Sequence, residues 1–245
     1  MQSQESSKQP RRTKPDDATG LIGGSRNKLR DPTGKAGQIV AVMEQRLTLG
    51  YYASGEMLSF ALLAEEFGVS RQPVSAAISH LRSSGFVEVI PHVGCRVVLP
   101  SPRELKDFFF VLGKIESAAV CLAAERYEGD EAGILLGISP SSDLGSLEDQ
   151  PRRRAYLNYL NRYHDQIWEM ARSPLLDGKV SELRRLSNFY LWQGVPELAP
   201  KAANQLIAER TAIARAIAAR DADLAARLME DHIRNKPRVI GIVQE

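Results

Sequence analysis

The sequence predicts a mainly α-helical protein, with an N-terminal winged helix-turn-helix and a C-terminal all-α helical bundle. Gly68 separates two short segments of helical spacing, and Ser70 begins the second of them. Two alternating, β-rich runs follow at 86–90 and 95–99, which is a hairpin signal. Beyond residue 102 apolar residues recur almost throughout at the spacing of helices. Three helices, a two-stranded ribbon and then further helices give this fold class.

The overall composition is compatible with two domains but says little about function. The chain has 245 residues, 43% of them hydrophobic, which is enough for two cores. No apolar run approaches the length of about 18 residues needed for a membrane span, and the start lacks a secretory signal, so we expect a cytoplasmic protein without membrane contact. Cys95 and Cys121 are not in a CxxC arrangement, so a disulfide framework or cysteine-rich zinc site is not expected.

The chain divides into four segments. Residues 1–36 contain few apolar side chains and an excess of Lys and Arg, which predicts a flexible basic tail. Residues 37–99 form the expected winged helix-turn-helix, 100–102 (Pro-Ser-Pro) a short stiff linker, and 103–240 an all-helical domain. Within the last domain helices are expected over 103–127, 151–172, 175–192, 197–220 and 222–236, with a partial helix and a loop over 129–150.

The stretch from Gly68 to Arg82 has the pattern of a helix that enters a DNA groove. We expect the Ser70 side chain to cap this helix by accepting a backbone N–H bond, and its apolar residues to anchor it on a small core. The remaining positions, Arg71, Gln72, Ser75, Ser79 and Arg82, are then free to face another molecule. Residues 37–100 contain four basic and five acidic side chains, so DNA binding would depend on where the arginines lie and not on bulk charge. The alternative is an ordinary solvated helix surface.

Two parts of the sequence resemble one family of bacterial proteins. The segment "LAEEFGVSRQPVSAAISHLRSSGFVEVIPHVGCRVV" (63–98) resembles the DNA-binding domain of the GntR family of transcription regulators. The pieces "KIESAAVCLAAE", "NRYHDQIWEMARSPLL" and "AERTAIARAIAARDADLAARLMEDHI" are similar to its all-helical FCD domain, which defines the FadR-type subgroup. The resemblance implies a homodimeric regulator with an effector-binding, dimerising C-terminal domain. Its expected partner is double-stranded operator DNA with a palindromic sequence.

The resemblance also implies which residues meet DNA. Arg71 and Gln72 would reach into the major groove, and a wing with Gly94 at its tip would lie along the neighbouring minor groove. Ser75 stands where the family usually has an arginine, so one charged contact is replaced. Either the operator sequence differs from that of relatives, or Arg82, His80 or the basic tail supplies a contact to the DNA backbone instead. The predicted DNA-binding set is Ser70, Arg71, Gln72, Ser75, Arg82, His92 and Gly94.

Many FCD domains hold a metal ion, and here the resemblance is incomplete. The family's ligands are an aspartate and three histidines. His164 and His232 match two of them, whereas Leu160 and Arg210 occupy the other two positions. Two imidazoles are a weak ligand set, and a guanidinium beside them repels a dication, so no cofactor is favoured. The alternative is zinc or nickel held by His164 and His232, with Asn161 supplying an oxygen.

A metal-free effector site is the favoured interpretation. In metal-containing relatives the ion helps to hold an organic carboxylate, and the planar guanidinium of Arg210 can hold a small carboxylate or sugar acid directly. His164 and His232 would donate to or orient this anion, and Asn161 or Arg185 would complete the site. The alternative makes Arg210 an inter-helix salt bridge, to Asp165 or Asp231, and the histidines ordinary core residues.

The predicted function is therefore DNA-binding transcription regulation, with repression relieved by the effector as the expected mode. A constitutive DNA-binding protein that senses nothing is the first rival. The second is an enzyme using His164 and His232, for which the sequence offers no nucleophile, no oriented base and no water-activating ligand set. No Walker, GxGxxG, HExxH or nucleophile-elbow motif is present either.

Overall fold

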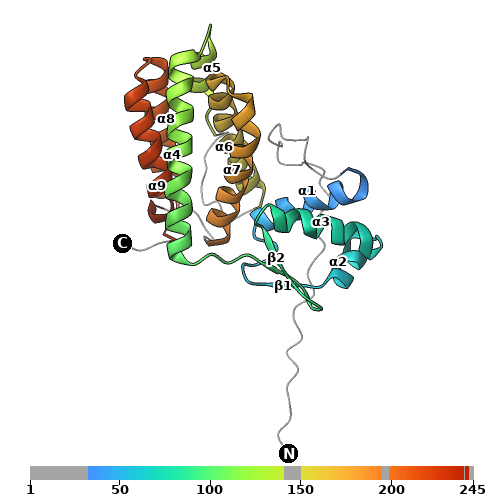
Figure 1. The fold of residues 1–245 in the computed structure, drawn as a ribbon. Coiled ribbons are helices and arrows are strands. Elements are labelled where there is room, and N and C mark those ends of the chain that lie inside the picture. The colour runs from blue at the N-terminus through green and yellow to red at the C-terminus, as the bar shows by residue number, and fades with distance from the viewer. Residues whose placement is uncertain (1–32, 141–149, 195–198, 240, 243–245) are drawn as a thin grey trace, which may run out of the picture.

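The computed structural model describes residues 33–140, 150–194, 199–239 and 241–242, which form two helical units (Figure 1). The smaller unit comprises the N-terminal elements, and the larger is an upright bundle of the C-terminal helices. The predicted mainly α class is confirmed. No helix of the described part is long and apolar enough to cross a membrane.

The N-terminal unit is a winged helix-turn-helix, as predicted. It contains α1 (Gly34–Thr48), β1 (Met57–Leu58), α2 (Phe60–Phe67), α3 (Arg71–Ser83), β2 (Val87–Ile90) and β3 (Gly94–Val97). The strands form an antiparallel sheet in the order β1-β3-β2. The β2–β3 hairpin is the wing, and β1 pairs with its inner strand.

The ends of these helices follow from local chemistry, with two corrections. Ser59 caps α2 by accepting a 3.3 Å bond from the Ala61 amide, and Gly68 ends it in the left-handed conformation at φ 62°. Ser70 occupies the N-cap position of α3, but its side chain makes no capping hydrogen bond, so that expectation was wrong. Helix α1 begins at Gly34, three residues before the expected start at Gly37.

The C-terminal unit contains six described helices. They are α4 (Pro102–Arg126), α5 (Glu131–Gly137), α6 (Gln150–Ala171), α7 (Pro174–Gly194), α8 (Pro200–Ala218) and α9 (Ala222–Val239). Ser101 and Glu104 cap α4 reciprocally, so Pro102 is already the first residue of this helix and not part of a linker. Asp221 caps α9 through a 3.0 Å bond from the Leu224 amide, as predicted.

Three expectations lie wholly or partly outside the described residues. These are the tail up to residue 32, the loop over 141–149 and the beginning of the helix expected from Glu197. The described part of the last of these, α8, ends at Ala218 and not at Arg220, which has a left-handed φ of 56°.

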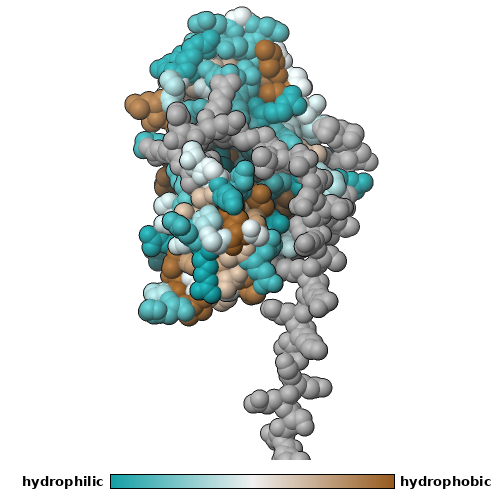
Figure 2. Space-filling view, turned by 90° about the vertical axis from the view of Figure 1, so that its right-hand side faces the viewer, coloured by the Kyte–Doolittle hydropathy of each residue, from teal (hydrophilic) through white to brown (hydrophobic). Residues whose placement is uncertain are grey.

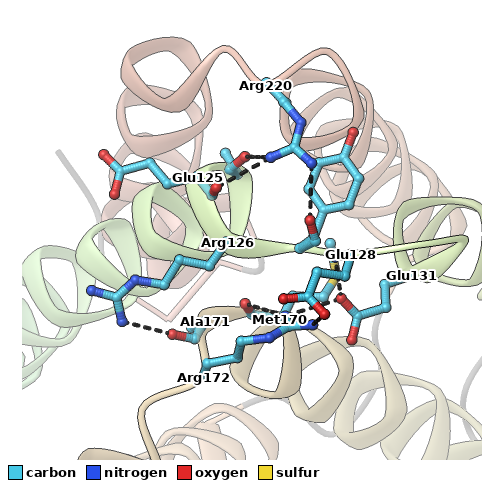
Figure 3. Close-up of polar contacts among 10 residues, drawn as sticks. Glu125, Arg126, Glu128, Glu131, Met170, Ala171, Arg172 and Arg220 are labelled. Carbon is cyan, nitrogen blue, oxygen red and sulfur yellow. Dashed lines mark hydrogen bonds and ion pairs between the residues drawn. The ribbon is translucent and has the colours of Figure 1, made fainter.

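Arginines tie helix ends together at one end of the bundle (Figure 3). Arg220 donates to three carbonyl oxygens at the end of α4, among them that of Tyr127 at 2.9 Å, and its guanidinium lies 3.9 Å from the centre of the Tyr127 ring. Arg126 donates to the Ala171 carbonyl at 3.1 Å, and Arg172 to that of Met170 at 3.1 Å. These cations satisfy carbonyl groups that the helix ends leave free.

Helix α7 belongs to both units. It lies on the side of the bundle nearest the winged unit (Figure 1), and its Phe189 is fully buried in the core of that unit, with its ring centre 5.1 Å from that of Phe86. Leu186 packs beside Gly85, and Arg185 forms a 3.3 Å ion pair with Glu44 of α1. One face of α7, a helix that comes much later in the chain, therefore forms part of the core of the winged unit.

Candidate DNA interface and buried polar cluster

One face of α3 is exposed and carries the predicted groove-reading residues. Val74, Ile78 and Leu81 are fully buried and hold the helix on the core. The opposite face presents Arg71, Gln72, Ser75, Ser79 and Arg82, all exposed. This face contains no acidic side chain, and the free amides of the first turn add partial positive charge near Arg71. Its shape and charge fit a DNA groove.

The wing differs from the prediction at Gly94. The exposed tip is the turn Pro91–Val93, with His92 at φ 63°, whereas Gly94 is buried as the first residue of β3. A Cβ at Gly94 would collide with the carbonyl oxygen of Leu58 in β1, so the glycine permits close strand contact instead of forming the tip. His92 remains exposed where a groove contact is predicted.

The side of the molecule seen in Figure 2 shows no broad apolar area where its surface is visible. Figure 2 views the molecule from its winged side, and hydrophobic residues form only small separated groups over the part that grey atoms leave visible. Arg96 on the wing is exposed but forms a 2.7 Å ion pair with Glu88, so its charge is partly neutralised. Arg71 and Arg82 are therefore the main cationic contribution of the described wing and α3 surface.

A cluster of buried polar side chains lies inside the C-terminal unit. We call it the polar cluster, and it consists of Glu116 (α4), His164 (α6), Arg210 (α8), and His232 and Lys236 (α9), with exposed fractions of 0%, 6%, 1%, 2% and 4%. Four helices contribute to it. Buried ionisable groups are rare unless they are paired, so each partner matters.

Arg210 is a buried cation without a carboxylate partner. Its guanidinium donates to the Tyr156 hydroxyl at 3.2 Å and lies 5.5 Å from the centre of the Tyr159 ring. Its Nε has no hydrogen-bond partner, and no described carboxylate oxygen lies within 4 Å of it. The proposed salt bridge from Arg210 to Asp165 or Asp231 is therefore wrong: Asp165 pairs with Arg184 at 3.0 Å.

The two predicted histidines are both in the cluster. His232 Nδ1 lies 2.6 Å from Glu209 Oε2 and donates to it, which leaves Nε2 as an acceptor without a partner. Burial, with the nearby charges of Arg210 and Lys236, lowers the pKa of His232 well below its usual value. Burial likewise lowers the pKa of His164 to about 4.

Glu116 and Lys236 were not among the predicted site residues. Glu116 Oε2 lies 3.5 Å from His164 Nδ1, and neither carboxylate oxygen has a hydrogen-bond partner. Burial opposes ionisation of Glu116, but His164, Arg184 and Lys236 outweigh it and lower its pKa. Burial, and then the charge of Arg210, lowers the pKa of Lys236 to about 7. Lys236 lies one helical turn after His232, which is the only sequence signal that could have indicated it.

The predicted role of Arg185 is wrong. This residue faces α1 and pairs with Glu44, whereas its neighbour Arg184 is buried and acts electrostatically on Glu116 and His164. Adjacent helical residues point about 100° apart, which places the two arginines on different faces. Asn161 is half-buried on α6, and its role stays a prediction.

The side chains of the cluster do not fit a metal ion. The described residues contain no group of three or more His, Cys, Asp or Glu side chains placed to hold one. Leu160 is buried where the family has an acid, and the cation of Arg210 acts on His232. A zinc or nickel ion would meet two imidazoles, each with one ring nitrogen turned toward a carboxylate, and the fixed positive charge of Arg210, which together are a poor donor set.

One polar side chain fastens the winged unit to α7. The Gln193 amide donates to the carbonyl oxygens of Leu47 and Tyr52 at 2.6 and 2.8 Å, and its carbonyl accepts from Ser54 N and Oγ at 2.9 and 3.2 Å. Both halves of the amide are therefore satisfied by the end of α1, by the loop that follows it and by a hydroxyl of that loop. Since α7 also carries Arg184, one helix touches both the polar cluster and the DNA-binding unit.

Fold and site together define a DNA-binding transcription regulator with a winged helix-turn-helix and a helical C-terminal domain. Residues 35–97 match the profile of the bacterial regulatory proteins of the gntR family, and residues 107–235 match that of the FCD domain. The chain belongs to the GntR family, in the group that carries an FCD domain. The resemblance inferred from the sequence is confirmed.

Similar proteins agree with this assignment. The chain is 26% identical over 218 residues to the putative HTH-type transcriptional regulator RmpR of Mycobacterium gastri, covering 82% of this chain and 78% of that protein. It is 25% identical over 167 residues to the HTH-type transcriptional regulator YieP of Escherichia coli K12, covering 60% and 72% respectively. Among solved structures, E. coli McbR/YncC has a TM-score of 0.66 at 18% identity, covering 85% of this chain and 98% of that one. A GntR regulator from Rhodococcus sp. RHA1 has a TM-score of 0.67 at 14% identity, covering 86% and 100%, and both likenesses show the fold alone.

Proposed function

We propose that the protein is a homodimeric repressor of the cytoplasm whose operator affinity is controlled by a small carboxylate or sugar acid bound at the polar cluster. Arg210 is the observation that carries this proposal. The guanidinium of Arg210 is 1% exposed, lacks a carboxylate partner and has no hydrogen-bond partner at Nε, so burying its charge costs free energy. A bound anion would offset that cost. A planar guanidinium binds a carboxylate through two parallel bonds.

The effector would act on DNA binding through α7. Arg184 brings α7 to the polar cluster, and Gln193 and Phe189 fasten it to the winged unit. A ligand that displaces Arg184 would shift α7 and with it α3. The size of the response is limited by the difference in ligand affinity between the two arrangements.

A dimer follows from the geometry of DNA recognition. Two copies of α3 would meet half-sites about one helical turn apart on a palindromic operator. Arg71 and Gln72 would read bases, Arg82 and Ser75 would lie near the backbone, and His92 would enter the minor groove. We assign the protein no catalytic activity: the Glu209–His232 pair has the geometry of an oriented base, but no nucleophile contacts its Nε2 in the described residues.

The decisive experiment starts from the operator. Genome-wide binding would identify it, and the neighbouring genes would indicate the chemistry of the effector. Calorimetric titration of carboxylates and sugar acids into wild type, Arg210→Ala and Arg210→Lys then tests the site, with operator binding and circular dichroism as controls for folding. Loss of anion binding in Arg210→Ala with retained folding is the expected result, and equal binding in wild type and variants would discard the site. An operator complex indifferent to every compound would favour a constitutive DNA-binding protein.

A further inference from the structure

Glu116 is a carboxylate enclosed at the centre of the C-terminal helices. It is 0% exposed, both of its oxygens lack a hydrogen-bond partner, and its nearest described polar contact is His164 Nδ1 at 3.5 Å. That distance exceeds a good N–H···O bond, for which about 2.7–3.2 Å is usual. The acceptor capacity of Glu116 is therefore unused within the protein.

The surroundings of Glu116 keep it an acceptor. His164 on α6, Arg184 on α7 and Lys236 on α9 all interact electrostatically with it. The nearby Tyr163 hydroxyl cannot serve it, because that hydroxyl donates to the Arg210 carbonyl oxygen at 2.9 Å. An ionised carboxylate accepts hydrogen bonds and donates none. A group that completes Glu116 must therefore bring its own donor hydrogens.

The cluster thus has two chemically different sides. Arg210 offers donors to an anion, while Glu116 and the unpartnered His232 Nε2 offer acceptors. Lys236 joins the two sides, because it interacts electrostatically with both Arg210 and Glu116. A ligand whose only polar group is one carboxylate would give Glu116 and His232 Nε2 no hydrogen-bond donor. A dicarboxylate would place a second negative charge next to Glu116.

We infer that Glu116 selects the effector: the ligand is an acid with a single carboxylate that also carries hydroxyl or ammonium donors, and simple fatty acids and dicarboxylates are rejected. This inference rests on the proposed effector site and adds the chemical class of its ligand. The competing role for Glu116 is a structural ion pair with protonated His164. The 3.5 Å distance between His164 Nδ1 and Glu116 Oε2 is longer than the about 2.7–2.9 Å of a charge-assisted hydrogen bond, which argues against that pair.

Calorimetry with a chain-matched set of acids tests the selection. The probes are hexanoate, adipate, 6-aminohexanoate and a six-carbon aldonate, in a buffer free of carboxylate and phosphate. The wild type should bind the aldonate or the amino acid at least about tenfold more tightly than hexanoate, and should not bind adipate. Glu116→Gln should lose that preference and admit adipate, because an amide both donates and accepts. Glu125→Gln, an exposed position on the same helix, is the matched control and should behave as wild type.

Two further measurements separate the explanations. Without ligand, Glu116→Gln should melt at the same temperature as wild type or higher, because it removes a buried charge; a clear fall would establish a structural ion pair and overturn the inference. If Arg210→Lys loses affinity for every acid while Glu116→Gln keeps the wild-type preference, the effector site stands and the selection by Glu116 is wrong. If no probe binds, or Arg210 variants bind all probes as wild type does, the proposed site itself fails.

Discussion

Replacing Gln193 by alanine should loosen the winged unit from α7. The side-chain amide makes four hydrogen bonds to Leu47, Tyr52 and Ser54, all of them in the N-terminal unit. Truncation removes every one of these bonds and leaves two carbonyl oxygens and one amide without their partner. The substitution leaves the net charge of the protein unchanged.

The expected loss can be estimated from these bonds. Each contributes about 1 kcal/mol net, so four amount to about 4 kcal/mol. Gln193 is only half-buried, and water can replace part of the lost bonding, which reduces the expected destabilisation to about 2–3 kcal/mol. Gln205→Ala is the matched control, because that exposed glutamine makes one bond within α8, to Glu209, and should cost less than about 0.5 kcal/mol.

Urea unfolding followed by circular dichroism gives the difference in free energy of unfolding between the two variants. Hydrogen exchange of the Ser54 amide gives a local measurement, and it should accelerate in Gln193→Ala alone, because this N–H donates to the glutamine at 2.9 Å. A Gln193→Ala variant as stable as Gln205→Ala, with Ser54 exchange unchanged, would refute the view that α7 is fastened here.

Three other regions give measurable expectations. Arg71→Ala should abolish specific operator binding, whereas Ser75→Arg should tighten DNA binding and raise the salt slope by about one unit, both measured by fluorescence anisotropy across a salt series. Gly94→Ala should destabilise the protein by about 2 kcal/mol or more in thermal unfolding, because its methyl group collides with the Leu58 carbonyl; a stable variant would contradict the close approach. Burial lowers the pKa of Lys236 from 10.5 to about 7, so between these values the unfolded chain holds a proton that the folded chain has lost. Stability should therefore rise with pH from about 7 to about 10, and Lys236→Met should reduce this slope in urea midpoints; an equal slope in both proteins would contradict the burial effect.

Local patterns in the sequence were sufficient for most of the helices and for the wing. Ser59 and Gly68 mark the ends of α2 by their own chemistry, and Val74, Ile78 and Leu81 identify the buried face of α3. The same reasoning failed where another element decides the outcome. Gly94 is buried because β1 lies beside it, and no property of the hairpin sequence indicates that neighbour.

The polar cluster shows a second limit. Arg210 and the two histidines were found through the family pattern, but choosing Arg185 instead of Arg184 was an error of one position that moved the prediction to a different face of α7. Lys236 was missed because a lysine is normally assigned to the surface. Gln193 has no local signal at all, since its partners lie 139 to 146 positions away in the chain.

The shared helix α7 also sets the order in which the protein can become complete during synthesis. Domains usually fold from the N-terminus as they leave the ribosome. Here the winged unit must wait for Phe189 to fill its core and for Gln193 to reach Ser54, 139 positions later. A nascent chain ending before α7 would expose Phe86 and the facing core. The DNA-reading surface is therefore finished only when most of the domain that controls it has already been made.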